Sequence, residues 1–250
     1  MSDALRAIYV IWQREIIKFW REKARIVTSL VQPAVWLFIM GKGIGSTFRG
    51  PMNVDYVQFM FPGVIAMTVL FSASFSAISI VWDREFGFLK EVLVAPVPRT
   101  AVVIGKALAG STTATLQGVM VLLFAPLIGV NLQAPVIIKT ILLLLFISFT
   151  VTSGGIVIAA KMQSFHSFQL VMNFLIMPMF FLSGAMFPIH NLPLWMKLMA
   201  RIDPMAYGVD ALKGVLIGAN EMGIGQDIVV LAVFCMLAIC IAVFLFNKEG

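Results

Sequence analysis

The stretch "DREFGFLKEVLVAPVPRT", residues Asp83 to Thr100, is the most charged segment in the middle of the chain. It lies between two long runs with almost no charge, at 57–81 and 101–130. Each run contains at least the roughly 20 mostly apolar residues that a helix needs to cross a bilayer. The two runs therefore predict membrane-spanning helices, and the charged stretch predicts the loop that joins them.

The composition of the whole chain is typical of an integral membrane protein. Of its 250 residues, 60% are hydrophobic and 12% are charged, which is about half the charged fraction of a soluble domain. The net charge of +6 comes from bases scattered among apolar runs, so it does not predict a nucleic-acid partner. Six stretches are long and apolar enough to span: 26–44, 57–81, 101–130, 140–160, 168–187 and 228–246. The sequence predicts an all-α integral membrane fold with six transmembrane helices.

The basic residues predict the orientation of the chain. Six of them precede the first span, whereas the next loop holds Arg49, with Lys42 at its edge. Because cytoplasmic flanks are enriched in Lys and Arg, we expect the N-terminus in the cytoplasm. Six spans return the C-terminus and the segment 83–100 to the same side. The expected location is the cytoplasmic (inner) membrane, with several passes and both termini cytoplasmic.

Residues 1–25 form a separate unit ahead of the first span. Its apolar side chains recur at spacings of three and four residues: Leu5, Ile8, Trp12, Ile16 and Phe19. Basic side chains do the same on a roughly opposite face: Arg14, Lys18, Arg21 and Arg25. This pattern predicts an interfacial elbow helix with its apolar face at the acyl boundary and its bases on anionic headgroups. The alternative is a solvated helix of a small cytoplasmic domain, for which the chain offers no other segment long enough to pack on it.

The segment between the fifth and sixth spans, 188–227, is the longest that does not span, and its first part is strongly apolar. A freely solvated loop does not have this composition. Two short helices that dip into the outer leaflet, with their backbone protected by protein, explain both the length and the apolarity. We therefore expect an outer re-entrant helical hairpin over about 188–213.

The motifs of several enzyme classes are missing. Lys106 follows Gly105, as in a Walker A loop, but Ala107 stands where that loop needs a hydroxyl residue. The two histidines, His166 and His190, are expected on opposite sides of the membrane, so they form neither a paired metal site nor a Ser-His relay. We expect no catalytic residue, no metal site and no cofactor in this chain.

Acidic residues are absent from all six expected spans. Ion-coupled transporters commonly bind protons or sodium through intramembrane carboxylates. The pattern therefore disfavours a transporter driven by ion coupling, although backbone carbonyls can also bind sodium.

Polar side chains form stripes on three expected spans. They are Thr68, Ser72, Ser76 and Ser79 on the second, Thr113 and Gln117 with Lys106 and Gly110 on the third, and Asn173 with Gln169 on the fifth. One interpretation is that small and hydroxyl residues let helices approach closely. The other is that these side chains line a path for an amphipathic substrate. The residues expected on such a path are Thr68, Ser72, Ser76, Ser79, Thr113, Gln117 and Asn173.

Two ordered motifs resemble those of a known family. The segment from Arg84 to Arg99, "REFGFLKEVLVAPVPR", resembles the cytoplasmic signature of type-2 ABC exporter permeases, approximately R-E-x-G-T-L-E-x-L-L-V-T-P-V. A second set of residues resembles the outer end of the fifth span and its hairpin, especially in the drug-exporter branch similar to daunorubicin exporters. It consists of Met177, Pro178, Phe181, Leu182, Ser183, Gly184, Phe187, Pro188, Leu192, Pro193, Trp195, Pro204, Tyr207 and Asp210.

The resemblance covers nearly the whole chain, with 26–250 as a six-span type-2 ABC transmembrane domain. In that family two permease subunits pair, and each docks one ATPase subunit, which binds ATP and Mg. The resemblance implies a permease half of an ATP-driven exporter of a lipophilic or amphipathic, drug-like compound, which enters between the first and fifth spans. Its expected partners are two ABC ATPase subunits, a second copy of itself and membrane lipids. A polysaccharide or lipid-linked glycan is the alternative cargo, and a self-contained membrane channel or enzyme is the alternative of another class.

The charged stretch is then the expected coupling helix, over about 84–98. Phe86, Leu89 and Leu93 recur at spacings of three and four, so a short helix can insert an apolar ridge into a groove of the ATPase. Pro96 and Pro98 end this helix before the next span. The expected docking residues are Arg84, Glu85, Phe86, Gly87, Leu89, Lys90, Glu91, Leu93, Pro96 and Arg99. A helix that lies on the headgroups without a partner is the alternative.

Overall fold

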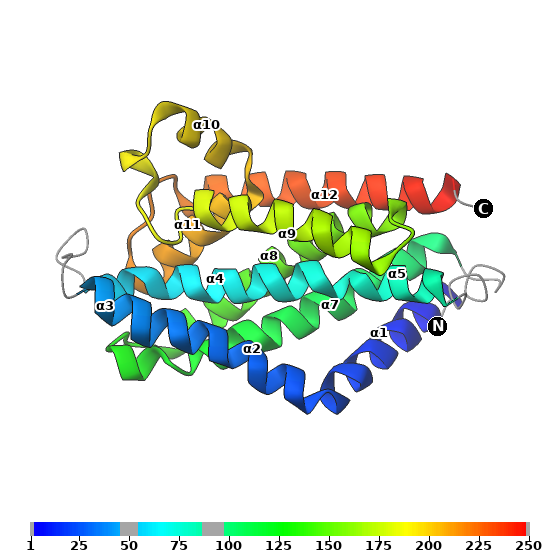
Figure 1. The fold of residues 1–250 in the computed structure, drawn as a ribbon, viewed down its shortest axis with the longest axis horizontal. Helices are drawn as coiled ribbons and strands as arrows, with labels where there is room; N and C mark the ends of the chain where they lie inside the picture. Colours follow the sequence, from blue (N-terminus) through cyan, green and yellow to red (C-terminus); the bar gives the residue numbers. More distant parts are fainter. Residues whose placement is uncertain (1–2, 46–54, 87–97, 249–250) are drawn as a thin grey trace.

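The computed structural model describes residues 3–45, 55–86 and 98–248, and all secondary structure in these ranges is helical. The predicted all-α class is confirmed. The long helices α4, α8, α9 and α12 lie side by side along the longest axis of the molecule (Figure 1). The N- and C-terminal ends lie at one end of this bundle, and α10 and α11 lie towards the other (Figure 1).

The elements follow in chain order. They are α1 (Asp3–Arg21), α2 (Lys23–Val35), the π-helical η1 (Trp36–Gly41), α3 (Lys42–Gly45), α4 (Tyr56–Ser76), α5 (Ile78–Glu85), α7 (Arg99–Leu122), the 3-10 turn η3 (Ala125–Ile128), α8 (Ala134–Lys161), α9 (Phe165–Leu182), the 3-10 turn η4 (Ile189–Asn191), α10 (Leu194–Ile202), α11 (Pro204–Ile217) and α12 (Ile224–Lys248).

The centre of the bundle is α4. From Tyr56 to Leu70 every side chain except Gln58 is buried, as expected of a helix that is apolar on all faces. It packs against α7, α8 and α11. The segment that follows α9 also approaches α4 closely, at Gly63. An added Cβ there would lie 2.5 Å from the carbonyl oxygen of Ala185. Helices α7, α8, α9 and α11 therefore hold fixed positions around α4.

The number of spans differs from the six expected. Four segments of the described chain are long and apolar enough to cross a membrane: Tyr56–Glu85, Ala134–Lys161, Phe165–Leu182 and Ile224–Lys248. A fifth is possible if Asp3–Arg21 and Ile26–Gly41, bent by 69°, count as one. The expected third span, α7, is not among them, because it buries polar residues that lower its hydropathy: Lys106, Ser111, Thr113, Thr115 and Gln117. Its 24 residues are still long enough to cross, so six spans remain a prediction.

Three acidic residues lie within the helices that form candidate spans: Asp83, Glu85 and Asp227. The second span continues to Glu85 and the last begins at Ile224, so each is longer than its apolar run. Asp83 and Asp227 therefore belong to these helices and are buried, with exposures of 9% and 0%. The expected spans 57–81 and 228–246 do not include these residues, so spans free of acids remain a prediction, with buried acids just beyond their ends.

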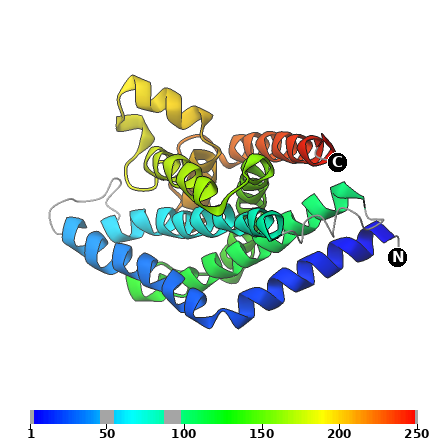
Figure 2. The same ribbon diagram turned by 45° about the vertical axis from the view of Figure 1, so that its right-hand side comes forward.

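Helix α1 packs differently from the interfacial helix that was expected. It meets α2 in a V (Figure 2), and it lies along α7 rather than alone on the membrane surface. An added Cβ at Gly105 would lie 3.1 Å from the Ile11 side chain, and Trp12 Nε1 donates a hydrogen bond of 3.1 Å to Thr112 Oγ1. Phe19 is 5% exposed. Much of the apolar face assigned to the acyl boundary therefore contacts protein, and α7 is the partner that the sequence did not reveal.

The expected hairpin region contains the two helices α10 and α11. From Met205 to Lys213 every residue of α11 is buried, and α11 packs against α4, α8 and α12. In contrast, α10 carries large exposed apolar side chains: Leu194, Trp195, Leu198, Met199 and Ile202. Entry of this pair into the outer leaflet remains a prediction.

Candidate functional site

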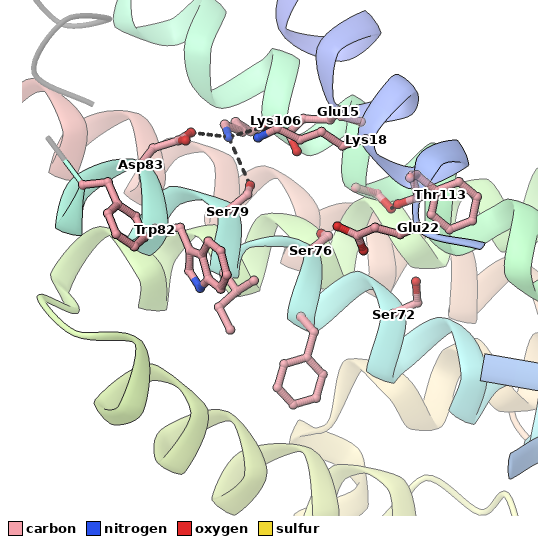
Figure 3. Close-up of a pocket in the computed structure, with 16 residues that line it drawn as sticks. Glu15, Lys18, Glu22, Ser72, Ser76, Ser79, Trp82, Asp83, Lys106 and Thr113 are labelled. Carbon is pink, nitrogen blue, oxygen red and sulfur yellow. Dashed lines mark hydrogen bonds and ion pairs between the residues drawn. The ribbon is translucent and has the colours of Figure 1, made fainter. Parts of the chain in front are cut away.

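Four charged side chains meet where α1, α5 and α7 come together, and we call them the charge cluster: Arg14, Glu15, Asp83 and Lys106. Lys106 Nζ lies 2.7 Å from Asp83 Oδ2 and 2.9 Å from Glu15 Oε1. Arg14 Nη2 lies 2.8 Å from Asp83 Oδ1. Figure 3 shows Lys106 between Asp83 and Glu15, with Ser79 as its third partner at 3.1 Å. One lysine thus joins three helices.

The charge cluster is mostly removed from solvent. The side chains of Lys106, Asp83 and Glu15 are 7%, 11% and 15% exposed. Charges buried to this degree are stable only when they are paired, and removal of one partner leaves an uncompensated charge that costs about 3–5 kcal/mol. The cluster therefore fixes α1 relative to α5 and α7.

Arg14 was expected to meet lipid headgroups, and the structure corrects this. Its guanidinium binds Asp83 in α5 instead. Lys18, which was assigned to the same face, lies 3.7 Å from Glu15 Oε1 and is half exposed. The spacing of the bases along α1 was read correctly, but the opposing acid is 69 residues away in the chain.

The charge cluster stands next to the expected coupling helix. Arg84 Nη1 donates to the carbonyl oxygen of Met162 at 2.9 Å, and the Phe165 amide donates to Glu85 Oε2 at 3.3 Å. On the far side, Arg99 Nη1 donates to the carbonyl oxygens of Phe246 and Asn247, at 2.8 and 3.0 Å. Both flanks of the segment 87–97 are thus tied to the end of the bundle that carries the termini.

The expected docking residues divide between described and undescribed parts of the chain. Phe86 is described and 77% exposed, and its ring packs against that of Trp82 at 5.9 Å between centroids. Arg84, Glu85 and Arg99 are also described. The remaining docking residues lie outside the described residues: Gly87, Leu89, Lys90, Glu91, Leu93 and Pro96. The coupling helix itself therefore remains a prediction.

Two adjoining cavities extend from the charge cluster along α4. The first, of about 420 Å³, is bounded by Glu15, Asp83 and Lys106 and reaches Thr113. The second, of about 650 Å³, continues between α2 and α9, where Gln32 lines it. Their shared lining residues are Glu22, Ser72, Phe75, Ile78 and Trp82. We call this pair of cavities the crevice (Figure 3 shows its first part).

Six of the seven expected path residues line the crevice: Thr68, Ser72, Ser76, Ser79, Thr113 and Gln117. Asn173 does not, because it lies exposed on α9. Close helix packing also operates here, since an added Cβ at Gly110 would collide with Ser76 and Thr152. Close packing is therefore observed at Ser76, whereas the substrate path along the crevice remains a prediction.

Hydroxyl groups deeper in the bundle join α7 to α8. Thr115 Oγ1 and Ser148 Oγ are 2.8 Å apart, and Ser148 also donates to the Ser111 carbonyl oxygen at 3.0 Å. These buried hydrogen bonds are structural and do not reach the crevice lining. Among the described residues no group of three or more His, Cys, Asp or Glu side chains could hold a metal ion.

The comparison with protein families decides between the classes left open by this geometry. The family model described as ABC-2 type transporter matches residues 6–217. The chain belongs to this family. The match includes the charge cluster, the expected coupling helix, the crevice and the hairpin, and it ends where α11 ends.

Relatives of this ABC-2 chain include proteins that are transport permeases by name. "Putative transport permease ycf38" of Cyanophora paradoxa is 24% identical over 247 residues, which cover 92% of this chain and 85% of the relative. "Inner membrane transport permease YadH" of Escherichia coli K12 is 26% identical over 234 residues, covering 91% and 90%. "Nodulation protein J" of Rhizobium leguminosarum bv. viciae is 24% identical over 243 residues, covering 96% and 93%. The chain is thus an ABC-2 transport permease, a membrane subunit of a transporter.

Sequence reasoning found this family but missed the charge cluster. Lys106 was placed on a polar stripe and Asp83 in the loop, while Glu15 was given no function. Two signals were present in the sequence. Glu15 is an acid among the bases of an amphipathic helix, and Asp83 follows the apolar run 57–81 by two residues, while Lys106 is a base near the start of the next run. What the sequence does not contain is the V between α1 and α2 that brings these side chains together.

Proposed function

We propose that this ABC-2 permease is one half of an ATP-driven exporter, in which two copies pair and each docks one ATPase subunit. The proposal rests on one observation: both flanks of the segment 87–97 are anchored at one end of the bundle, and the charge cluster joins that end to α1. A push on this segment reaches three helices through stiff ionic contacts. No catalytic group is needed in the chain itself, because ATP and Mg are bound by the partner subunit.

The anchored flanks suggest how movement is transmitted. Closure of the two ATPase subunits presses on the coupling helix, and Asp83 passes the displacement to Lys106 and Glu15. Because Lys106 of α7 pairs with Glu15 of α1 and with Asp83 of α5, the three helices move as one unit rather than bending separately. The crevice lies directly beside these three helices, so its width changes with the unit.

The lining of the crevice favours a lipophilic or amphipathic cargo that leaves the cell. Phe75, Trp82 and Ile78 supply apolar surface, and Ser72 and Ser79 supply hydroxyl groups on the same wall. Entry from the membrane fits the second cavity, which lies between Gln32 of α2 and Phe165 of α9, the expected first and fifth spans. The cytoplasmic membrane, with both termini in the cytoplasm, is the location that suits this direction.

A polysaccharide or lipid-linked glycan is the second candidate cargo. Aromatic faces beside rows of hydroxyl groups also suit sugar rings, and Trp82 with Ser79 and Thr113 presents this combination. Stimulation of ATP hydrolysis by a panel of lipophilic drugs, compared with lipid-linked sugars, separates the two cargo classes. A response to the sugars alone would replace the drug-like cargo.

The decisive experiment is purification of the tagged chain from its native membranes, followed by identification of co-purifying ATPases and reconstitution in liposomes. We expect an ABC ATPase in the complex and transport of a fluorescent lipophilic dye that requires ATP hydrolysis. Transport or chemistry by the chain alone, without nucleotide or ATPase, would show instead a self-contained channel or enzyme.

A further inference from the structure

A second group of buried charges lies at the hairpin end, where α11 meets α12. Asp227, in the first turn of α12, is 0% exposed, and neither of its carboxylate oxygens has a hydrogen-bond partner among the described residues. The carboxylate of Asp210, in α11, lies against it and is itself 3% exposed. Two buried acids thus meet at this end of the molecule.

The hydrogen bonds of Asp210 show what Asp227 lacks. Asp210 Oδ1 accepts from the Glu221 amide and Oδ2 accepts from the Met222 amide, both at 2.8 Å. Asp210 therefore has its acceptor oxygens satisfied, whereas the polar group beside Asp227 is another acceptor. Two ionised carboxylates in this position repel each other, and neither can donate a hydrogen bond to the other.

We propose that Asp227 and Asp210 form a proton-binding site, in which Asp227 is a carboxylic acid whose hydroxyl donates to a carboxylate oxygen of Asp210. One proton removes the repulsion between the like charges. It also supplies the donor that the buried oxygens of Asp227 lack. A proton is therefore sufficient as the ligand, because no described group donates a hydrogen bond to the Asp227 oxygens.

The neighbouring charges agree with a single proton. Lys213 Nζ, on α11, donates to the Gly184 carbonyl oxygen and lies 3.8 Å from the centre of the Phe59 ring, so its ammonium is already occupied. With Asp227 protonated, Lys213 and Asp210 balance in charge. Glu221, in the loop, is 3.2 Å from His190 Nδ1 at the surface.

The remaining helices packed on α12 add no charge at this site among the described residues. On α8, Lys139 is exposed near the same end. On α7, Arg99 contacts the opposite end of α12. The groups that face Asp227 are therefore those of α11 and the loop that follows it.

The shared proton adds a polar attachment between α11 and α12, which also pack against each other. Asp210 holds the loop at 221–222 through its two amide bonds, and Asp227 belongs to the last helix. While the proton is bound, α11, this loop and α12 form one closed unit at the end of the molecule opposite the termini. Loss of the proton places two negative charges between α11 and α12 and separates them.

The experiment uses the purified full chain in nanodiscs of neutral lipid and compares the wild type with Asp227→Asn, which keeps a hydrogen-bond donor but cannot ionise. Infrared spectra at neutral pH should show the carbonyl band of a protonated carboxylic acid in the wild type and a weaker band in D227N. Asp55→Asn, at an exposed aspartate, is the matched control. A band that is identical in the wild type and D227N overturns the proposal.

Thermal unfolding as a function of pH gives an independent measurement. The folded chain holds a proton that the unfolded chain releases, so the wild-type melting temperature should fall as pH rises above about 4, the ordinary pKa of an aspartate, and D227N should show less of this fall. If D227N does not fold, Asp210→Asn serves, since its amide donates to Asp227 and leaves no need for the proton. The proposal is contradicted if the melting temperature of the variant that folds depends on pH as steeply as that of the wild type. Stabilisation by sodium in place of protons would contradict it as well.

Discussion

Two buried aspartates near the ends of candidate spans, Asp83 and Asp227, have opposite surroundings. Asp83 lies within 2.8 Å of the cationic groups of Lys106 and Arg14. Asp227 has no partner among the described residues and lies against a second acid. The first arrangement is held by opposite charges, whereas the proposed attraction in the second depends on a shared proton.

This difference supports the different functions proposed for the two ends of the molecule. The end that carries the termini contains a stiff ionic joint, which suits transmission of force from an ATPase. The hairpin end contains contacts that can be opened by a change in protonation. A transporter that closes one end while it opens the other needs contacts that persist at one end and contacts that can separate at the other.

The largest expected effect is on the ionic joint. Lys106→Met removes the cation between two buried carboxylates, so we expect the free energy of unfolding to fall by about 3–5 kcal/mol. Lys161→Met, at an exposed lysine, is the matched control and should change stability by less than about 0.5 kcal/mol. Unfolding in detergent measures both variants, and D83N/K106M should recover part of the loss. Equal effects of the two lysine substitutions would mean that the joint is not stabilising.

The next effect concerns the coupling helix. Leu89→Arg or Glu91→Arg should lower ATP-driven export by about tenfold or more, because a single apolar or charged anchor can contribute about 2 kcal/mol to an interface. ATP hydrolysis should continue, uncoupled from transport. Asn191→Arg, exposed at the hairpin end, is the control that should transport normally. Unchanged export in L89R and E91R would remove this segment from the docking surface.

A smaller effect is expected in the crevice, which lies between the two ends. Ser72 lines both cavities, so Ser72→Trp should obstruct cargo and reduce export several-fold, while the chain still inserts and binds its ATPase. Asn173→Trp places the same side chain on the exposed face of α9 and should have little effect. Export measured in liposomes distinguishes them, and equal rates in both variants would exclude the crevice as the path.

The sequence predicted the helical class and the family because these depend on local patterns. Runs of apolar residues predict helices that cross a bilayer, and "REFGFLKEVLVAPVPR" carries its motif within 16 consecutive positions. Six of the seven expected path residues line the crevice because hydroxyl residues at helical spacing share a face. Asn173 lies outside it, because a polar residue alone does not say which neighbour its helix face meets.

The two charged sites could not be predicted for a common reason. Asp83 and Asp227 lie one or two residues beyond their apolar runs, where hydropathy stops but the helix continues. Their surroundings depend on residues distant in the sequence. Arg14 and Asp83 are 69 residues apart, and Asp210 and Asp227 are 17 residues apart. Such pairings follow from the packing of α1 on α7 and α11 on α12, which no single segment specifies.

The smallest effect concerns a third buried acid, Asp203, which lies between α10 and α11, outside the candidate spans. Burial raises its pKa from 3.8 to about 7, partly opposed by the hydrogen bond that its side chain accepts from the Met205 amide. The folded chain therefore binds a proton that the unfolded chain has released, and the stability from Asp203 is lost as pH rises from about 4 to about 7. Asp203→Asn keeps an acceptor for the Met205 amide, so the variant should melt at a similar temperature at low pH and lose less stability near neutral pH, with a difference of a few degrees. Melting curves of D203N, D227N and the double variant, recorded at several pH values, measure this. Additive effects on the pH dependence of the melting temperature would show that this end of the molecule has two independent proton sites. If the melting temperature of the double variant depends on pH as steeply as that of D227N alone, Asp203 is not protonated.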